Sequence, residues 1–414
     1  MTQDLLSERI LSTPPSFIRS ILKTASDPEI ISFAGGLPNP ISFPQKELAQ
    51  SAQRIVERYG SKVFQYSITA GLEELRDEIA RRYNALYGLD LRAEHVLITT
   101  GSQQALDLIG KALLNAGDGV ILEKPSYLGA IQAFSQYGPQ FYSVELTDEG
   151  MDPEGLRQTL ARHTAKVMYA IPNFQNPTGL TYTADNRARI RDVLRQYPDL
   201  VLVEDDPYGE LRFDGAPLPY IGAGELGNSI LLGSFSKTIT PGMRLGYLIT
   251  QNTELLRYIS IAKEATDLHT NVYAQYLILD YLQNNDYQAH MDRIKALYRD
   301  QAQTMLQAMA EYFPADVRYT RPHGGMFIWA TLPHGVSAMQ LFPRALQKKV
   351  AFVPGDPFYI GQKDVNTMRL NYTNADSETI REGIRRLGDL LRGLSGARGS
   401  GATSGAVDKP DRAR

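Results

Sequence analysis

A lysine that follows an apolar run lies among residues that could hold an anion. The run is Ile-Leu-Leu at residues 230–232, which is typical of a buried strand. Lys237 follows it, with the hydroxyls of Ser234 and Ser236 on the same stretch and a guanidinium at Arg244. Hydroxyl groups and an arginine can together bind a phosphate. The stretch therefore combines a candidate nucleophilic amine with a candidate anion site.

An amine in such a place can form a Schiff base with an aldehyde. The reaction needs the neutral amine, and a cationic or apolar environment lowers the pKa of a lysine so that this form is available. A lysine at a strand end is usually only a solvated side chain, so this interpretation depends on its neighbours. We hypothesise that Lys237 binds pyridoxal phosphate, which carries both an aldehyde and a phosphate.

A pair of carboxylates follows another predicted strand, at residues 200–203. Carboxylates directly after a buried strand are costly unless they have partners. A metal could be such a partner, but no histidine accompanies the pair. We favour a pyridinium nitrogen, because a carboxylate at Asp205 would keep it protonated and let the ring accept electrons. Tyr208, three residues later, could then hydrogen-bond the phenolic oxygen of the same ring.

Three further motifs could face the same ligand. Ser102 and Gln103 open a predicted helix, whose free N–H groups suit a phosphate, although serine is also a common helix cap without a ligand. Asn176, in Asn-Pro-Thr-Gly, offers an amide donor or simply forms a turn. Gly36, in Gly-Gly-Leu-Pro, permits close approach of the backbone to a ligand or forms a plain turn.

An arginine occurs within an apolar strand near the C-terminus. Arg369 lies in Met-Arg-Leu-Asn-Tyr at residues 368–372. A buried arginine needs an anionic partner, and its planar fork suits a carboxylate. The partner is either the carboxylate of a substrate or an acidic side chain in a structural salt bridge.

The elements that must position these residues alternate between strand and helix. Helical stretches separate short apolar strands at 95–100, 120–122, 141–144, 167–171, 200–203 and 230–232. This alternation predicts an α/β fold with a mostly parallel sheet covered on both faces. Ligands bind such sheets beyond the carboxyl ends of the strands, where the polar motifs fall.

After residue 250 the pattern changes to long helical stretches, at 252–285 and 286–312, followed by mixed strands and helices. We expect an N-terminal segment that belongs to the small domain and forms a substrate lid, then a large cofactor-binding domain. A small C-terminal α+β domain and a disordered tail rich in Gly, Ser and Ala follow. The predicted bounds of these four parts are 1–44, 45–285, 286–394 and 395–414.

The composition limits the class of protein. The chain has 414 residues, enough for two domains, and 43% of them are hydrophobic. The net charge is −3, and acidic and basic residues are mixed along the chain, so the sequence shows no basic region of the kind that binds nucleic acid or an anionic membrane. Without cysteines or histidines at metal-ligand spacing, we expect no disulfide and no metal site. No secretory signal and no run of about eighteen apolar residues is present, so we expect a soluble cytoplasmic protein.

Taken together and in their order, the motifs resemble those of fold-type-I aminotransferases of the class I/II group, over about residues 16–394. The resemblance is carried by Gly-Ser-Gln, Asn-Pro-Thr-Gly, Asp-x-Pro-Tyr, Ser-x-Ser-Lys with a later Arg, and Arg-x-x-Tyr. One position departs from the family, Pro207, where an alanine is usual. Further similarity to the 2-aminoadipate aminotransferases of bacterial lysine biosynthesis, and to their kynurenine relatives, occurs at 32–38, 98–106, 174–179 and 267–270.

The resemblance implies a pyridoxal-phosphate transferase fold with a seven-stranded sheet in the large domain. It also implies a role for each motif residue. Lys237 would form the Schiff base and carry the proton between substrate and cofactor, and Asp205 would hold the pyridinium N–H. Asn176 and Tyr208 would bond the 3′-oxygen of the ring. The other cofactor-binding residues would be Tyr127, stacked on the ring, and, around the phosphate, Ser102, Gln103, Ser234, Ser236 and Arg244.

The same resemblance implies which residues contact the substrate and which residue contacts the neighbouring subunit. Arg369 would bind the α-carboxylate of the substrate, Gly36 and Asn176 would line its pocket, and Arg19 would meet a distal carboxylate. Tyr66 would reach the phosphate of the neighbouring subunit, which implies a homodimer with shared sites.

The implied reaction is a ping-pong transamination between an L-amino acid, best guessed as 2-aminoadipate, and 2-oxoglutarate, giving a 2-oxo acid and L-glutamate. One alternative is a broad-specificity kynurenine, aromatic or branched-chain aminotransferase. Another is a different pyridoxal-phosphate reaction, such as β-elimination, on the same scaffold. A ligand-sensing regulator would carry a DNA-binding domain first, but only about 30 residues precede Phe33.

Overall fold

The computed structural model describes residues 5–13, 21 and 27–399. The candidate residue Arg19 therefore lies outside the described residues. Within the described ranges, no helix is both long enough and apolar enough to cross a membrane.

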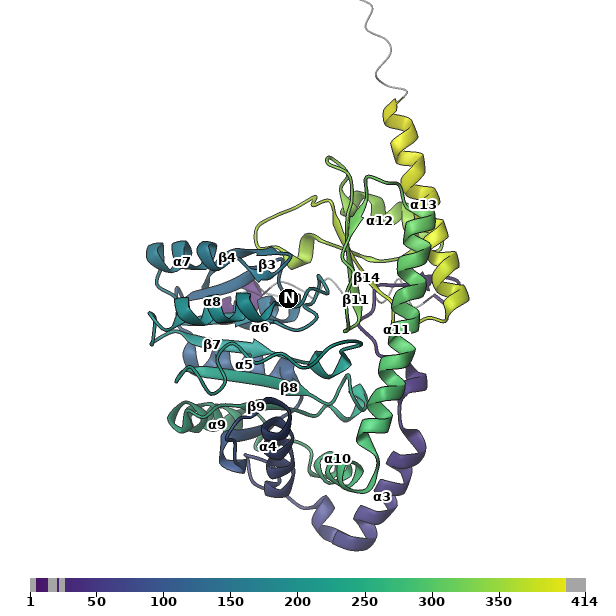
Figure 1. Cartoon of the computed structure of the whole chain (residues 1–414). Coiled ribbons are helices and arrows are strands. Elements are labelled where there is room, and N and C mark those ends of the chain that lie inside the picture. The colour runs from purple at the N-terminus through teal and green to yellow at the C-terminus, as the bar shows by residue number, and fades with distance from the viewer. Residues whose placement is uncertain (1–4, 14–20, 22–26, 400–414) are drawn as a thin grey trace, which may run out of the picture.

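A sheet of eight strands forms the centre of the first part of the chain (Figure 1). Across the sheet the strands follow the order β2-β9-β8-β7-β6-β3-β4-β5. They are β2 (Val96–Thr99), β3 (Gly119–Lys124), β4 (Gln140–Thr147), β5 (Gly150–Met151), β6 (Val167–Ala170), β7 (Val201–Asp205), β8 (Ser229–Ser234) and β9 (Gly246–Ile249). The sheet has one strand more than the seven expected, because the two-residue β5 adds an antiparallel edge to β4.

The middle of this sheet is parallel. Strands β4, β3, β6, β7 and β8 pair in parallel, whereas β9 runs antiparallel between β8 and β2. All residues of β6 and β7 are buried, as expected for parallel strands that are covered on both faces. The carboxyl ends of β6, β7 and β8 therefore meet at one edge of the sheet.

Helices cover both faces of the large sheet. One face carries α5 (Ser102–Leu113) and α6 (Leu128–Ser135), and the other carries α7 (Pro153–Arg162) and α8 (Ala184–Leu194). Successive strand residues point to opposite faces. Accordingly, Met168 and Leu202 belong to the core under α7 and α8, whereas Tyr169 and Val203 belong to the core under α5 and α6.

A second, antiparallel sheet lies in the C-terminal part of the chain. Its order is β10-β11-β14-β13, with β10 (Arg318–Tyr319), β11 (Phe327–Thr331), β13 (Val353–Pro354) and β14 (Thr367–Asn371). Strand β1 (Ile31–Ser32) pairs in parallel with β12 (Val350–Ala351), so an early segment joins this part of the chain. The helices of this part are α11 (Tyr287–Tyr312), α12 (Ala338–Gln347) and α13 (Ser377–Gly399), and α11 and α13 run side by side at the right of Figure 1.

Two helical predictions need correction. The stretch 252–285 is two helices, α9 (Thr253–Asp267) and α10 (Val272–Asn284), because the backbone turns at Leu268, where φ is 63°. Helix α13 reaches Gly399, so residues 395–399 of the expected disordered tail are helical, and residues 400–414 lie outside the described part. Earlier in the chain, before the large sheet, lie α3 (Gln45–Tyr59) and α4 (Glu73–Tyr87).

Candidate active site

A cavity of about 270 Å³ opens at the carboxyl ends of β6, β7 and β8. It brings together every predicted site residue that the structure describes except Tyr66. The lining residues are Gly36, Ser102, Gln103, Tyr127, Ile171, Asn176, Asp205, Pro207, Tyr208, Ser234, Ser236, Lys237, Pro241, Arg244, Phe327 and Arg369. Residues from both sheets contribute, so the cavity lies where the two parts of the chain meet.

Lys237 lies in the turn that follows β8. Its Nζ donates a hydrogen bond of 2.7 Å to the carbonyl oxygen of Gly36. Burial, together with the weaker effect of the positive charges of Arg369 and Arg244, lowers the pKa of the Lys237 amine to about 8. A substantial fraction of this lysine is therefore neutral near pH 7 to 8, as a nucleophilic amine requires.

Asp205 ends strand β7 with one satisfied and one unsatisfied oxygen. Its Oδ2 accepts a 2.8 Å hydrogen bond from the hydroxyl of Tyr169. Its Oδ1 is buried and has no hydrogen-bond partner among the described residues. Burial raises the pKa of the Asp205 carboxyl to about 7, and the bond from Tyr169 opposes that rise. A ring N–H placed beside Oδ1 would supply the missing donor and favour the carboxylate.

The start of α5 forms a cradle suited to a phosphate. Gly101 has φ of 81°, and a Cβ there would lie 2.7 Å from Nη2 of Arg244, so the guanidinium packs directly on this turn. The Oγ of Ser102 is buried and lacks a partner in the described part of the chain. Gln103 donates to the carbonyl of Gly129 at 3.0 Å. A helix N-terminus, a free hydroxyl and an arginine together suit a dianion.

Arg369, on β14, is buried, and no carboxylate from the described part of the chain pairs with it. It is 1% exposed, and its Nη1 and Nη2 donate to Asn176 Oδ1 at 2.8 Å and to Ala34 O at 2.9 Å. Its Nε has no partner among the described residues, and the guanidinium lies 4.3 Å from the ring centroid of Phe327. No described acidic side chain pairs with Arg369, which argues against a structural salt bridge and favours a bound carboxylate.

Two tyrosines complete the cavity wall. Tyr127 caps the start of α6, and Tyr208 follows β7 with its ring 5.9 Å from that of Phe327. Burial raises the pKa of both hydroxyls, so each is a neutral donor at physiological pH. Both can therefore stack on or hydrogen-bond a planar ring.

One predicted residue, Tyr66, does not line the cavity, and another, Arg19, has no described position. Tyr66 is 79% exposed, and its ring lies 5.7 Å from that of His269. Arg19 lies outside the described residues. Sequence reasoning in turn missed Phe327 and Tyr169, which lie inside apolar strands. The only signal at Tyr169 was a hydroxyl in an otherwise apolar run.

Comparison with known proteins identifies the class. The model of the family described as aminotransferase class I and II matches residues 38–387, so the chain belongs to this family. It has fold type I and is an aminotransferase that uses pyridoxal phosphate, which confirms the predicted fold, enzyme class and cofactor.

Individual relatives cover almost the whole chain. It is 46% identical over 383 residues to a 2-aminoadipate transaminase of Thermus thermophilus, covering 92% of this chain and 94% of the relative. It is 39% identical to aromatic-amino-acid aminotransferase 1 of Thermococcus litoralis, covering 93% and 94%. The crystal structure of LysN, an α-aminoadipate aminotransferase of Thermus thermophilus complexed with N-(5′-phosphopyridoxyl)-L-leucine, matches with a TM-score of 0.88 and 43% identity, covering 95% and 99%.

Proposed function

We propose that this enzyme transfers the amino group of an L-amino acid, with 2-aminoadipate as the preferred donor, to 2-oxoglutarate. The products are the corresponding 2-oxo acid and L-glutamate. One observation carries the reaction class: Arg369 is buried in the cavity wall, 1% exposed, and no acidic side chain of the described residues pairs with it. An α-carboxylate is the ligand that all amino-acid substrates share and that such an arginine binds best.

The cavity fits the cofactor because its unsatisfied atoms match what the cofactor offers. Asp205 Oδ1 needs a donor, and the ring nitrogen carries one when protonated. Ser102 Oγ and the start of α5 need an acceptor, and the phosphate supplies it. When bound, pyridoxal phosphate supplies an electron sink for the pair left at the substrate Cα.

We assign each predicted residue of the cavity a role toward the cofactor or the substrate. We assign the attachment of the cofactor to Lys237, whose amine would also carry the proton that leaves the substrate Cα. Asp205 holds the ring nitrogen protonated. Asn176 and Tyr208 hold the 3′-oxygen and Tyr127 stacks on the ring. The residues assigned to the phosphate and its surroundings are Ser102, Gln103, Ser234, Ser236 and Arg244, with Gly36 lining the substrate pocket.

We also propose a homodimer in which Tyr66 completes the site of the neighbouring subunit. Tyr66 does not line the cavity of its own chain, and it stands beside two further exposed apolar residues, Phe64 and Ile68, which are 70% and 57% exposed. Several exposed apolar side chains within one short segment are typical of an interface. A cytoplasmic location stays a prediction from the sequence.

The choice of substrate rests on the relatives. One is named for 2-aminoadipate, another for aromatic amino acids, and a solved relative carries a leucine adduct. A broad-specificity aminotransferase is therefore the second candidate. Arg19, at which we place the distal carboxylate of 2-aminoadipate, would decide between them.

A panel of amino donors with 2-oxoglutarate tests the proposal. We expect the highest kcat/KM with 2-aminoadipate. Arg19→Ala should reduce 2-aminoadipate turnover and keep leucine turnover, whereas the exposed Arg321→Ala should change neither. Equal losses on both donors in Arg19→Ala would remove the distal-carboxylate role, and equal kcat/KM for all donors in the unchanged enzyme would favour broad specificity.

A further inference from the structure

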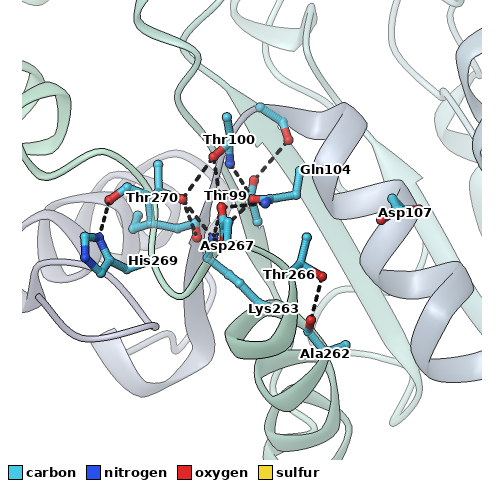
Figure 2. A network of polar contacts seen from close by, with 12 residues as sticks. Thr99, Thr100, Gln104, Asp107, Ala262, Lys263, Thr266, Asp267, His269 and Thr270 are labelled. Carbon is cyan, nitrogen blue, oxygen red and sulfur yellow. Dashed lines mark hydrogen bonds and ion pairs between the residues drawn. The ribbon is translucent and has the colours of Figure 1, made fainter. Parts of the chain in front are cut away.

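A buried lysine outside the cavity is the centre of a polar network (Figure 2). Lys263 lies on α9, and its side chain is 0% exposed. Its Nζ lies 2.8 and 3.0 Å from the two carboxylate oxygens of Asp267, 3.2 Å from Gln104 Oε1 and 3.0 Å from Thr270 Oγ1. The ammonium thus contacts three separate side chains, from α9, α5 and the turn that precedes α10.

One arm of this network holds both sides of the phosphate cradle. Gln104 Nε2 donates to Asp267 Oδ2 at 2.6 Å, and Gln104 Oε1 accepts from the backbone N–H of Thr100 at 2.8 Å. The hydroxyl of Thr100 also donates to Asp267 Oδ2, at 3.3 Å. Thr100 and Gln104 flank residues 101–103, which form the turn and first residues of α5. The backbone around the cradle is therefore fixed from outside the cavity.

The second arm holds a strained turn. Leu268 has φ of 63° and ψ of −59°, and the N–H of His269 donates to the carbonyl of Asp267 at 2.7 Å, which makes a γ-turn with positive φ. Such a conformation persists only where its surroundings hold it. Asp267 on one side and Thr270 on the other are both bound by Lys263.

Fold stability alone does not explain a buried ammonium here. Burying a lysine charge carries a large desolvation cost, and a well-packed apolar side chain commonly gives equal stability. What an apolar side chain cannot do is hold a carboxylate, an amide and a hydroxyl from three segments in one geometry. Preorganised groups bind a ligand with less loss of conformational freedom.

We propose that Lys263 is a positioning residue for the cofactor phosphate, which it serves by fixing Asp267, Gln104 and Thr270 around the turn at 101–103. This inference rests on the proposed function in one respect, namely that this turn and Arg244 hold the phosphate. Lys263 touches neither substrate nor cofactor. It acts through the segments that it holds together.

The test compares the binding of two ligands to the cofactor-free full-length chain: pyridoxal phosphate and pyridoxal, which lacks the phosphate. We expect Lys263→Met to weaken binding of pyridoxal phosphate by about tenfold, the equivalent of one charged hydrogen bond, and binding of pyridoxal by less than about twofold. The melting temperature of the same cofactor-free chain reports the fold separately. Equal weakening of both ligands, or no weakening, overturns the inference.

Two further variants keep the test decisive. Lys263→Met leaves the charge of Asp267 unpaired, so the double variant Lys263→Met/Asp267→Asn should recover melting temperature while its selective loss for the phosphate remains. Full recovery of pyridoxal phosphate binding in the double variant would mean that the loss in Lys263→Met came only from the unpaired charge of Asp267, and it would overturn the proposal. Thr270→Val removes one contact of Lys263 without a change of charge, so it remains informative even if Lys263→Met does not fold. It should weaken binding of pyridoxal phosphate more than binding of pyridoxal, by a smaller factor than Lys263→Met. An unchanged ratio of the two affinities in Thr270→Val counts against the proposal.

Two controls separate this inference from the proposed function. Arg54→Met breaks an ion pair of 2.6 Å with Asp280 between α3 and α10, away from the cavity, and should lower only the melting temperature. Arg244→Met should lose selectivity for the phosphate because it removes a proposed direct contact. If Arg244→Met loses it and Lys263→Met does not, only the positioning role is wrong. If neither loses it, the phosphate site itself is wrong.

Discussion

Arg369 Nη1 donates a hydrogen bond of 2.8 Å to the side-chain oxygen of Asn176, which lies 193 positions earlier in the chain. The bond joins β14 of the antiparallel sheet to the loop after β6 of the large sheet. With a second bond from Nη2 to Ala34 O, it sets the orientation of the guanidinium before any substrate arrives. An arginine held in this way loses little freedom when it binds a carboxylate.

Replacing this arginine should therefore weaken all amino donors alike. We expect Arg369→Lys to lower kcat/KM by about 100-fold for every donor, because lysine keeps the charge but loses the planar fork. Steady-state kinetics with an acidic and an apolar donor would measure this loss, and Arg321→Lys, at an exposed arginine, should leave both values unchanged. A fall in kcat with an unchanged KM would contradict carboxylate binding by Arg369.

The hydrogen bond from Tyr169 should set the acid side of the pH profile. Its hydroxyl stabilises the ionised form of Asp205, so Tyr169→Phe should raise the pKa of that carboxyl by about one unit and move the acid limb of kcat to higher pH. Tyr182→Phe is a matched control, because Tyr182 is also buried and donates to a carboxylate, Glu123, at 2.7 Å. If the acid limb of the kcat profile does not move in Tyr169→Phe, or moves equally in both variants, the Tyr169 hydroxyl does not set the pKa of Asp205.

Attachment of the cofactor should depend on the protonation of Lys237. Only the neutral amine reacts, and the pKa of Lys237 is lowered to about 8 from its ordinary value of 10.5. Below that pKa the neutral fraction falls about tenfold for each pH unit. We therefore expect the rate of recombination of pyridoxal phosphate with the cofactor-free chain to rise with pH and level off above about 8, as followed by absorbance. A rate that keeps rising towards pH 10 would mean an ordinary lysine.

The glycine before α5 should resist substitution. Gly101 has φ of 81° and ψ of 166°, a region that only glycine adopts readily, and a Cβ there would lie 2.7 Å from Arg244 Nη2. Gly101→Ala should lower stability and weaken binding of pyridoxal phosphate. Gly88→Ala, where φ is 67° and the space around is open, should cost only about 1 kcal/mol of unfolding free energy and leave cofactor binding intact. Thermal denaturation with and without cofactor measures both effects, and equal behaviour of the two variants would be the contrary result.

Much of the cavity was predictable from local patterns. Asp205 and Asn176 each follow a run of apolar residues, and parallel strands bring their carboxyl ends to one edge. The residues that were missed lie inside such runs. Tyr169 points from the middle of the sheet to Asp205 on the next strand, and this depends on the register of Tyr169 opposite Val203, which no local pattern reveals.

The break between α9 and α10 was missed for a related reason. Helical periodicity continues across it, and no glycine or proline marks Leu268. The turn is held by tertiary contacts of Lys263 with Asp267 and Thr270 rather than by local propensity. A lysine in an amphipathic helix is ordinarily exposed, so its burial could not be predicted either.

By itself, the sequence determined the alternation of strands and helices, the polar residues at strand ends and the family to which the chain belongs. These follow from local periodicity and from motif order, which are properties of neighbouring residues. Only the tertiary structure decided that Arg369 meets Asn176, that one oxygen of Asp205 has no partner among the described residues, and that Lys263 is buried. Each depends on contacts between distant segments, which form only when the whole chain packs.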